Sequence, residues 1–135
     1  YEFNVKQRVD EFGHFITQWP WQIWATITFR NSFRISNHYL RSQWDRWISR
    51  IRKSQGREPF WVRSVEIGTG QDVPHFHVLM GDIDLPAREL PRLWHPRTGN
   101  ARAEVYDPER RAPWYLAKDP EAVEFSSNLR LPEKW

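Results

Sequence analysis

Two histidines stand one residue apart in the stretch DVPHFHVLMGD, which covers residues 72–82. Successive side chains of a β-strand point to opposite faces, so His75 and His77 share one face and Phe76, Val78 and Met80 share the other. Neutral imidazole is the commonest metal ligand, so the histidine face predicts a metal site. The alternative interpretation is a pair of histidines that are simply hydrogen-bonded at the edge of a sheet.

A carboxylate beside the two imidazoles would complete a facial set of three ligands and leave other positions open. The segment FWVRSVEIG (60–68) is predicted to be a strand and TGQDVP (69–74) a turn, so the two strands form a hairpin. A turn centred at residues 71 and 72 places Glu66 opposite His77. With nitrogen and oxygen donors alone, Mn²⁺, Mg²⁺, Zn²⁺, Fe²⁺ and Ni²⁺ are all candidates.

Two families that use the same histidine spacing fit the chain poorly. Histidine-triad hydrolases need a third histidine at position 79, which is leucine here. Cupins follow the motif with a carboxylate and a later histidine, for which Asp82 and His95 are available. A cupin is nearly all β, however, whereas this chain carries the pattern of a long amphipathic helix.

A nucleophile is available in the segment PWYLAKD, at residues 113–119. Tyr115 and Lys118 are three positions apart, so on a helix a phenol and an ammonium share one face and converge on one phosphate. A tyrosine is neutral at pH 7, with an ordinary pKa of ~10, and attacks a phosphodiester only when its oxygen is activated. The alternative is two ordinary surface residues of a helix.

The elements that position these residues follow from periodicity. WQIWATITFR (21–30) is predicted to be a strand because it is rich in β-branched and aromatic residues. Ser36 or Asn37 is predicted to cap a helix that ends at Gly56. The buried stripe of that helix is predicted to consist of Leu40, Trp44, Trp47, Ile48 and Ile51.

The second half of the chain is predicted to hold shorter elements. These are a short helix at 86–95 interrupted by Pro91, a strand at 101–107 and a helix at 112–119 with Pro113 in its first turn. The tail from residue 120 to residue 135 is weakly patterned and is expected to be irregular. Helices and strands alternate, and the best strand pair is antiparallel, which favours an α+β fold with helices packed on an antiparallel sheet.

The composition sets the broad class. A chain of 135 residues is expected to form a single domain, residues 1–135. It has no cysteine, which excludes disulfides, thiolate metal sites and a cysteine nucleophile and suits a reducing cytoplasm. No apolar run approaches the ~18 residues of a membrane span, and no signal peptide is visible, so no membrane partner is expected.

Positive charge is concentrated in one segment. The net charge is only +3, but residues 30–63 hold nine basic and two acidic residues, whereas the rest of the chain after them holds nine basic and twelve acidic ones. Sixteen of the twenty basic residues are arginine, whose planar fork matches phosphate. The segment predicts a polyanion partner, and the alternative is a solvated helix face.

The order of these motifs resembles the HUH endonucleases, the tyrosine-dependent nickases that include rolling-circle replication initiators, relaxases and some single-strand transposases. The peptide PHFHVLM matches the histidine, hydrophobic, histidine motif. WATITF resembles the family's first strand, WDRWISRIRK its basic helix and WYLAKD its Tyr-x-x-Lys helix. The resemblance covers residues 21–119. The family often continues with another aromatic and a lysine, and DPEAVEF (119–125) departs from that pattern.

The resemblance implies a ferredoxin-like antiparallel sheet of about five strands with the histidine strand at its centre. His75, His77 and Glu66 would bind Mn²⁺ or Mg²⁺. Tyr115 would attack one phosphodiester of single-stranded DNA, leaving a 5′-phosphotyrosine link and a free 3′-hydroxyl, with Lys118 as an auxiliary catalytic residue. One tyrosine follows the motif on a helix, which indicates the one-tyrosine replication-initiator type. Tyr106, in a predicted strand, is the weaker candidate nucleophile.

Eight residues are predicted to contact DNA. Arginines would track phosphates and make binding salt-dependent, tryptophans outside the periodic elements would stack on unpaired bases, and threonines of the first strand would contact the substrate. They are Arg30, Arg34, Arg41, Arg63, Trp19, Trp21, Thr26 and Thr28.

The function that follows is sequence-specific nicking and joining of single-stranded DNA at an origin or nick site, including one in a hairpin. We expect it to initiate rolling-circle replication of a bacterial plasmid or phage, in the cytoplasm, with a host helicase or polymerase as partner. Two alternatives stay open. One is a single-strand transposase or mobilisation nuclease of the same superfamily, and the other is an origin-binding module that does not cut.

Overall fold

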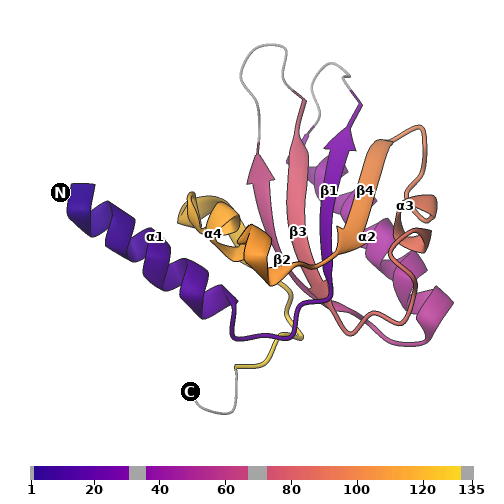
Figure 1. Cartoon of the computed structure of the whole chain (residues 1–135). Helices are drawn as coiled ribbons and strands as arrows, with labels where there is room; N and C mark the ends of the chain where they lie inside the picture. Colours follow the sequence, from indigo (N-terminus) through magenta and orange to yellow (C-terminus); the bar gives the residue numbers. More distant parts are fainter. Residues whose placement is uncertain (1, 31–35, 67–72, 132–135) are drawn as a thin grey trace.

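A computed structural model describes residues 2–30, 36–66 and 73–131 of the chain. The fold is α+β, with a five-stranded antiparallel sheet in the order β4-β1-β3-β2-β5 (Figure 1). The strands are β1 (Ile23–Phe29), β2 (Phe60–Glu66), β3 (His75–Gly81), β4 (Gly99–Val105) and β5 (Val123–Phe125). The histidine motif therefore begins the middle strand, which has a hydrogen-bonded neighbour on each side.

Four α-helices and two short 3₁₀ helices connect or extend the strands. They are α1 (Glu2–Ile16), α2 (Asn37–Gln55), α3 (Glu89–Arg92), η1 (Pro108–Arg110), α4 (Ala112–Ala117) and η2 (Pro120–Ala122). In Figure 1, α2 lies behind the sheet, and α1 and α4 lie on the opposite side of it. None of the helices in the described ranges is long and apolar enough to cross a membrane.

The long helix α2 covers one face of the sheet, as its periodicity predicts. Ser36 caps it by accepting a hydrogen bond from the backbone N–H of Tyr39, and Gly56 ends it in the left-handed region at φ 77°. The predicted stripe is confirmed residue for residue: the buried side chains are Leu40, Trp44, Trp47, Ile48 and Ile51. They pack on the alternating apolar residues of β1 and β3, such as Ile27, Phe76 and Val78.

The other face of the sheet is divided between core and site. At one end, Val62 and Leu79 pack against Leu116 and Ala117 of α4 and against Ile16 at the end of α1. At the other end the same face of β1, β2 and β3 carries the polar residues Thr26, Thr28, Ser64, Glu66, His75 and His77. The apolar end of this face thus holds α4 in place next to the polar residues at the other end.

Two elements differ from the expectations. No element was predicted before residue 21, where α1 lies and packs against α4 so closely that a Cβ on Gly13 would clash with the Trp114 ring. The tail expected to be irregular from residue 120 instead supplies η2 and then β5, which pairs with β2. A three-residue strand is too short for periodicity to predict, and its pairing with β2 stabilises it.

Candidate functional site

The strand register brings Glu66 beside both histidines, but not in the predicted pairing. Glu66 lies opposite His75, and Ser64 lies opposite His77, so the prediction that Glu66 faces His77 is wrong. The observed pairing of β2 with β3 is centred one residue earlier in the chain than predicted, which shifts the partner of each residue by two and preserves the side on which each residue lies. The glutamate side chain is long enough to reach the second imidazole diagonally.

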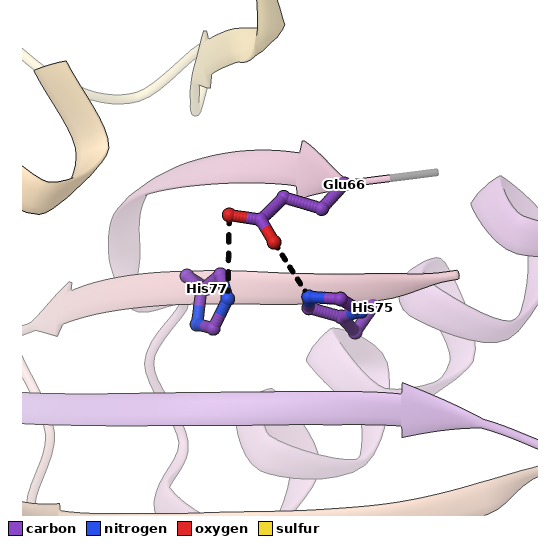
Figure 2. A group of neighbouring side chains, drawn as sticks. All are labelled: Glu66, His75 and His77. Atoms are coloured by element: carbon purple, nitrogen blue, oxygen red, sulfur yellow. Dashed lines mark hydrogen bonds and ion pairs between the residues drawn. The ribbon is translucent and has the colours of Figure 1, made fainter. Parts of the chain in front are cut away.

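Glu66, His75 and His77 form a cluster that could hold a metal ion. Glu66 Oε2 is 2.7 Å from His75 Nε2, and Glu66 Oε1 is 3.6 Å from His77 Nε2. Figure 2 shows the carboxylate facing the two rings from the neighbouring strand. One ligand atom from each residue lies within 4.8 Å of the other two. This is the donor set predicted from the sequence.

The other ring nitrogens hold the imidazoles in this orientation. His75 Nδ1 is 3.1 Å from the carbonyl oxygen of Val73, and His77 Nδ1 is 3.4 Å from Thr26 Oγ1. Metal-binding histidines commonly have such a partner on the nitrogen that does not bind the ion. Both nitrogens of His75 face oxygens that only accept hydrogen bonds, and a neutral imidazole carries one N–H. The Nε2 position therefore needs either a second proton or a cation, and a metal ion fits this requirement.

The electrostatics of the cluster favour the protonation states of His77 and Glu66 that can bind a metal ion. Burial lowers the pKa of His77, and the charges of His75 and Lys118 lower it further, against the opposing effect of Glu66. Burial raises the pKa of Glu66, but hydrogen bonds from His75 and Lys118 and the nearby positive charges outweigh it, and the net shift is downward. At neutral pH the cluster accordingly holds an unprotonated imidazole and a carboxylate, the forms that bind a cation.

The helix α4 places Tyr115 and Lys118 over this cluster. The hydroxyl of Tyr115 donates a hydrogen bond to Glu66 Oε1 at 3.3 Å and lies 3.3 Å from His77 Nε2. Lys118 Nζ is 3.2 Å from the same Glu66 oxygen and 3.7 Å from the centre of the Tyr115 ring. The prediction that Tyr115 and Lys118 lie on one face is confirmed, since both side chains contact Glu66 Oε1.

Packing on both sides fixes the position of α4. Pro113 occupies its first turn, where a missing N–H is tolerated, and Leu116 and Ala117 are buried against the sheet. On the outer side, Trp114 Nε1 donates to Asp10 Oδ1 of α1 at 2.9 Å. The phenol of Tyr115 and the ammonium of Lys118 are thus directed to the cluster by an anchored helix.

The pKa of Lys118 is raised despite its partial desolvation. Burial lowers this pKa, but hydrogen bonds to Tyr115 and Glu66 and the attraction of Glu66 outweigh burial. The side chain is therefore an ammonium at neutral pH, beside the phenol oxygen. A fixed positive charge at this position stabilises negative charge that develops on the phenol or on a bound phosphate.

A cavity of about 280 Å³ opens next to Tyr115, on the side toward β4. His77 and Tyr115 line the wall nearest the cluster, and Trp24 and Thr26 contribute from β1. The indole of Trp24 is stacked near His77, with ring centres 5.8 Å apart and planes inclined by 12°. Sequence reasoning missed Trp24 as a site residue, although it alternates with Thr26 on the same predicted face.

The residues predicted to bind DNA are not gathered at one place. Thr26 and Thr28 lie on the site face, opposite His77 and His75, respectively. Arg30 is exposed directly after β1, and its Nε donates to the carbonyl oxygen of Pro96 at 3.0 Å. Arg41 is exposed on α2, which packs on the other face of the sheet. Arg34 lies outside the described residues.

Three of the predicted DNA contacts are buried. Trp19 and Trp21 are only 9% and 6% exposed, and their indole N–H groups donate to the carbonyl oxygens of Arg130 and Ile16. They belong to the core between α1 and the sheet, so the prediction that they stack on bases is wrong. Periodicity missed them because they lie in the connection between α1 and β1.

Arg63 is also unsuited to bind a phosphate. It is 5% exposed and points to the α2 side of the sheet, where its guanidinium lies 4.7–4.8 Å from the ring centres of Trp44, Trp61 and Phe76. Its Nη2 is 3.2 Å from Glu124 Oε2. The prediction of Arg63 as a DNA contact is wrong because strand alternation turns it away from the histidine face.

Comparison with known proteins found no matching family model, no matching curated protein and no matching solved structure.

Proposed function

We propose that the chain is an HUH-type endonuclease that nicks and rejoins single-stranded DNA through Tyr115. The observation that carries the proposal is the position of the Tyr115 hydroxyl, 3.3 Å from both Glu66 Oε1 and His77 Nε2. A phenol held beside a potential metal site, with an ammonium next to it, is the arrangement needed to activate tyrosine as a nucleophile. Neither a purely structural histidine pair nor a binding module requires it.

The topology supports the same proposal. The strand order β4-β1-β3-β2, the connection through α2 and the central position of β3 support the proposal of a ferredoxin-like sheet. We infer that β5 and α1 are additions to that arrangement. The fold by itself does not specify a function, which depends on the residues of the site.

The residues of the chain would act as follows. The Tyr115 oxygen attacks the phosphorus of one phosphodiester, the new P–O bond forms, and the bond to the 3′-oxygen breaks. The phenol donates a hydrogen bond to Glu66 Oε1, which orients its oxygen, and the phenol proton passes to solvent as the P–O bond forms. The departing 3′-oxygen takes up a proton from solvent and becomes a hydroxyl, and Lys118 stabilises the charge that develops near the phenol.

Glu66, His75 and His77 would hold the divalent cation, for which Mn²⁺ or Mg²⁺ is proposed. When bound, such an ion would polarise the scissile phosphate and offset its charge. The phosphotyrosine link conserves the energy of the broken bond, so attack by a 3′-hydroxyl reverses the reaction and joins strands. We accordingly propose nicking and joining at a replication origin of a plasmid or phage in the bacterial cytoplasm, with host replication proteins as partners.

The test is formation of a covalent adduct. The protein and Mn²⁺ are mixed with a pool of labelled single-stranded oligonucleotides and separated under denaturing conditions, and the adduct is mapped by peptide mass spectrometry. We expect an adduct on Tyr115 that is lost with EDTA. Salt-sensitive binding without any adduct, in a pool that contains tight binders, would instead establish the origin-binding module that does not cut.

A further inference from the structure

The cavity beside Tyr115 has a second wall that the nicking chemistry does not use. Opposite His77 and Tyr115, this wall consists of residues of β4 and the segment that follows it: Glu104, Tyr106, Asp107 and Arg110. The cavity is about 280 Å³ in volume and is partly open to solvent. The same cavity is therefore lined by the Tyr115 phenol and, on this second wall, by carboxylates, a phenol and a guanidinium.

This wall is rich in hydrogen-bond acceptors. Asp107 Oδ1 accepts a hydrogen bond from the backbone N–H of Glu109 at 3.0 Å, while its Oδ2 has no partner among the described residues. Glu104 Oε2 is 3.6 Å from Arg110 Nη1 in an exposed pair. Two carboxylates therefore line this wall beside one guanidinium, and their oxygens can accept hydrogen bonds from N–H donors.

Three aromatic side chains, one tryptophan and two tyrosines, also line the cavity. Trp24 presents its indole, Tyr115 lies edge-on to it at 6.0 Å between ring centres, and Tyr106 adds a half-buried phenol. Nucleobases taken out of a stack are held by aromatic side chains and recognised by hydrogen bonds at their Watson–Crick edges. Aromatic surfaces can stack on a base, and carboxylates can accept hydrogen bonds from its N–H groups, so both kinds of group suit a nucleobase.

We propose that this cavity binds the base of a nucleotide next to the scissile phosphate and selects a base with an exocyclic amine. Carboxylates accept hydrogen bonds from the amine of cytosine, adenine or guanine. Thymine presents two carbonyl oxygens and a single N–H on the same edge, so the wall repels it. The position of this nucleotide, next to the scissile phosphate, rests on the proposed function, because Tyr115 and His77 line both the cavity and the reaction site.

Binding of mononucleotides tests the cavity without any cleavage. The four deoxynucleoside 5′-monophosphates are titrated separately into the protein, and the indole N–H signal of Trp24, assigned with a Trp24→Phe variant, is followed by NMR. We expect the amine-bearing nucleotides to shift this signal with at least about tenfold higher affinity than thymidine monophosphate. Equal affinity for all four, or no shift with any of them, would overturn the proposal.

Variants of the acceptor wall locate the selectivity. Asp107→Ser keeps an oxygen that caps the N–H of Glu109 but is too short to reach a base. We expect Asp107→Ser combined with Glu104→Gln to bring the ratio of the affinities for amine-bearing nucleotides and for thymidine monophosphate close to one. Glu109→Gln is the matched control, since this exposed carboxylate lies beside the cavity without lining it. Selectivity that survives the double variant would contradict the assigned wall.

A second measurement separates this inference from the proposed function. In an oligonucleotide that the protein cleaves, the bases on each side of the cleavage point are replaced by analogues that lack only the amine, such as hypoxanthine for guanine. We expect kcat/KM to fall about tenfold at one of the two positions. Cleavage with no such effect at either position would overturn the proposed base-binding site but leave the proposed function intact. Selective mononucleotide binding with no Tyr115 adduct would overturn the proposed function, while the cavity's selectivity would stand.

Discussion

The hydroxyl of Tyr115 donates a hydrogen bond to Glu66 Oε1 at 3.3 Å, which links α4 to β2 across 49 residues of the chain. The same carboxylate lies 2.7 Å from His75 Nε2 through its other oxygen. Glu66 thus connects the candidate nucleophile with the candidate metal ligands. Each member of this group has a distinct expected phenotype.

Tyr115→Phe is expected to reduce cleavage of single-stranded DNA by about a thousandfold or more while leaving DNA affinity within about twofold, because only the attacking oxygen is lost. Single-turnover cleavage and fluorescence anisotropy measure the two effects. Tyr39→Phe is the matched control, since that exposed phenol lies on α2. Undiminished cleavage by Tyr115→Phe would move the nucleophile elsewhere, with Tyr106 first in line despite a pKa that burial and Asp107 raise.

Removing a ligand of the cluster is expected to weaken Mn²⁺ binding by about a hundredfold or more, since even indirect partners of metal ligands contribute 10–100-fold. His77→Ala and Glu66→Gln are the informative variants, and isothermal titration calorimetry measures the affinity. His38→Ala removes an exposed imidazole on α2 and serves as control. Unchanged Mn²⁺ affinity in both cluster variants would exclude this group as the metal site.

Lys118→Gln is expected to lower kcat about tenfold to a hundredfold with little change in KM, because the ammonium acts on charge that develops during the reaction. Lys53→Gln, on the exposed side of α2, controls for the loss of one positive charge. Steady-state kinetics separates the two parameters. A rise in KM at constant kcat would assign Lys118 to substrate binding instead.

Arg63→Met is expected to leave the free energy of unfolding unchanged or to raise it by about 1 kcal/mol. The buried guanidinium has no hydrogen-bond partner at Nε or Nη1 within the described residues, and apolar replacements of incompletely paired buried charges are often neutral or stabilising. Glu124→Gln should instead lower stability by about 1 kcal/mol, since it weakens the pairing of that cation. Urea denaturation measures both. A loss above 3 kcal/mol in Arg63→Met, or a loss of DNA affinity, would contradict this interpretation.

Stability should fall slightly in acid through Asp84. A hydrogen bond and the charge of Arg57, 2.7 Å away, lower the pKa of Asp84 in the folded protein. A carboxyl with a lowered folded pKa stabilises the fold above its unfolded pKa, and this contribution disappears as the pH falls through the folded value. Both side chains are about half exposed, so the effect is small and screened by salt.

The comparison is the urea midpoint between pH 7 and pH 3 in Asp84→Asn and in the original chain. We expect the variant to lose less stability on acidification, and Asp119→Asn, at an exposed carboxylate, to behave like the original chain. An acid dependence that is as steep or steeper in Asp84→Asn would show that the ion pair does not stabilise the fold.

Local periodicity was enough to predict the parts of the molecule that depend on neighbours in sequence. The stripe of α2, its Ser36 cap and its Gly56 end follow from a 3.6-residue repeat and from backbone rules that act within one turn. The shared face of His75 and His77 follows in the same way from strand alternation, and that of Tyr115 and Lys118 from helical spacing. The candidate site was therefore visible as two separate pairs before any fold was known.

Only the tertiary structure determined how those pairs meet. The pairing of Glu66 with His75 depends on the length and geometry of a turn, which periodicity does not contain, and a two-residue shift leaves the face pattern unchanged. Trp19 and Trp21 pack against Phe125 and Phe60, respectively, which are distant from them in sequence, so only the folded chain shows that they are buried. Strand alternation alone puts Arg63 on the face opposite Glu66, but only the packing of α2 on that face shows that its side chain is buried. Burial and register result from long-range packing, so the sequence alone identified the chemical groups while the fold decided which of them meet.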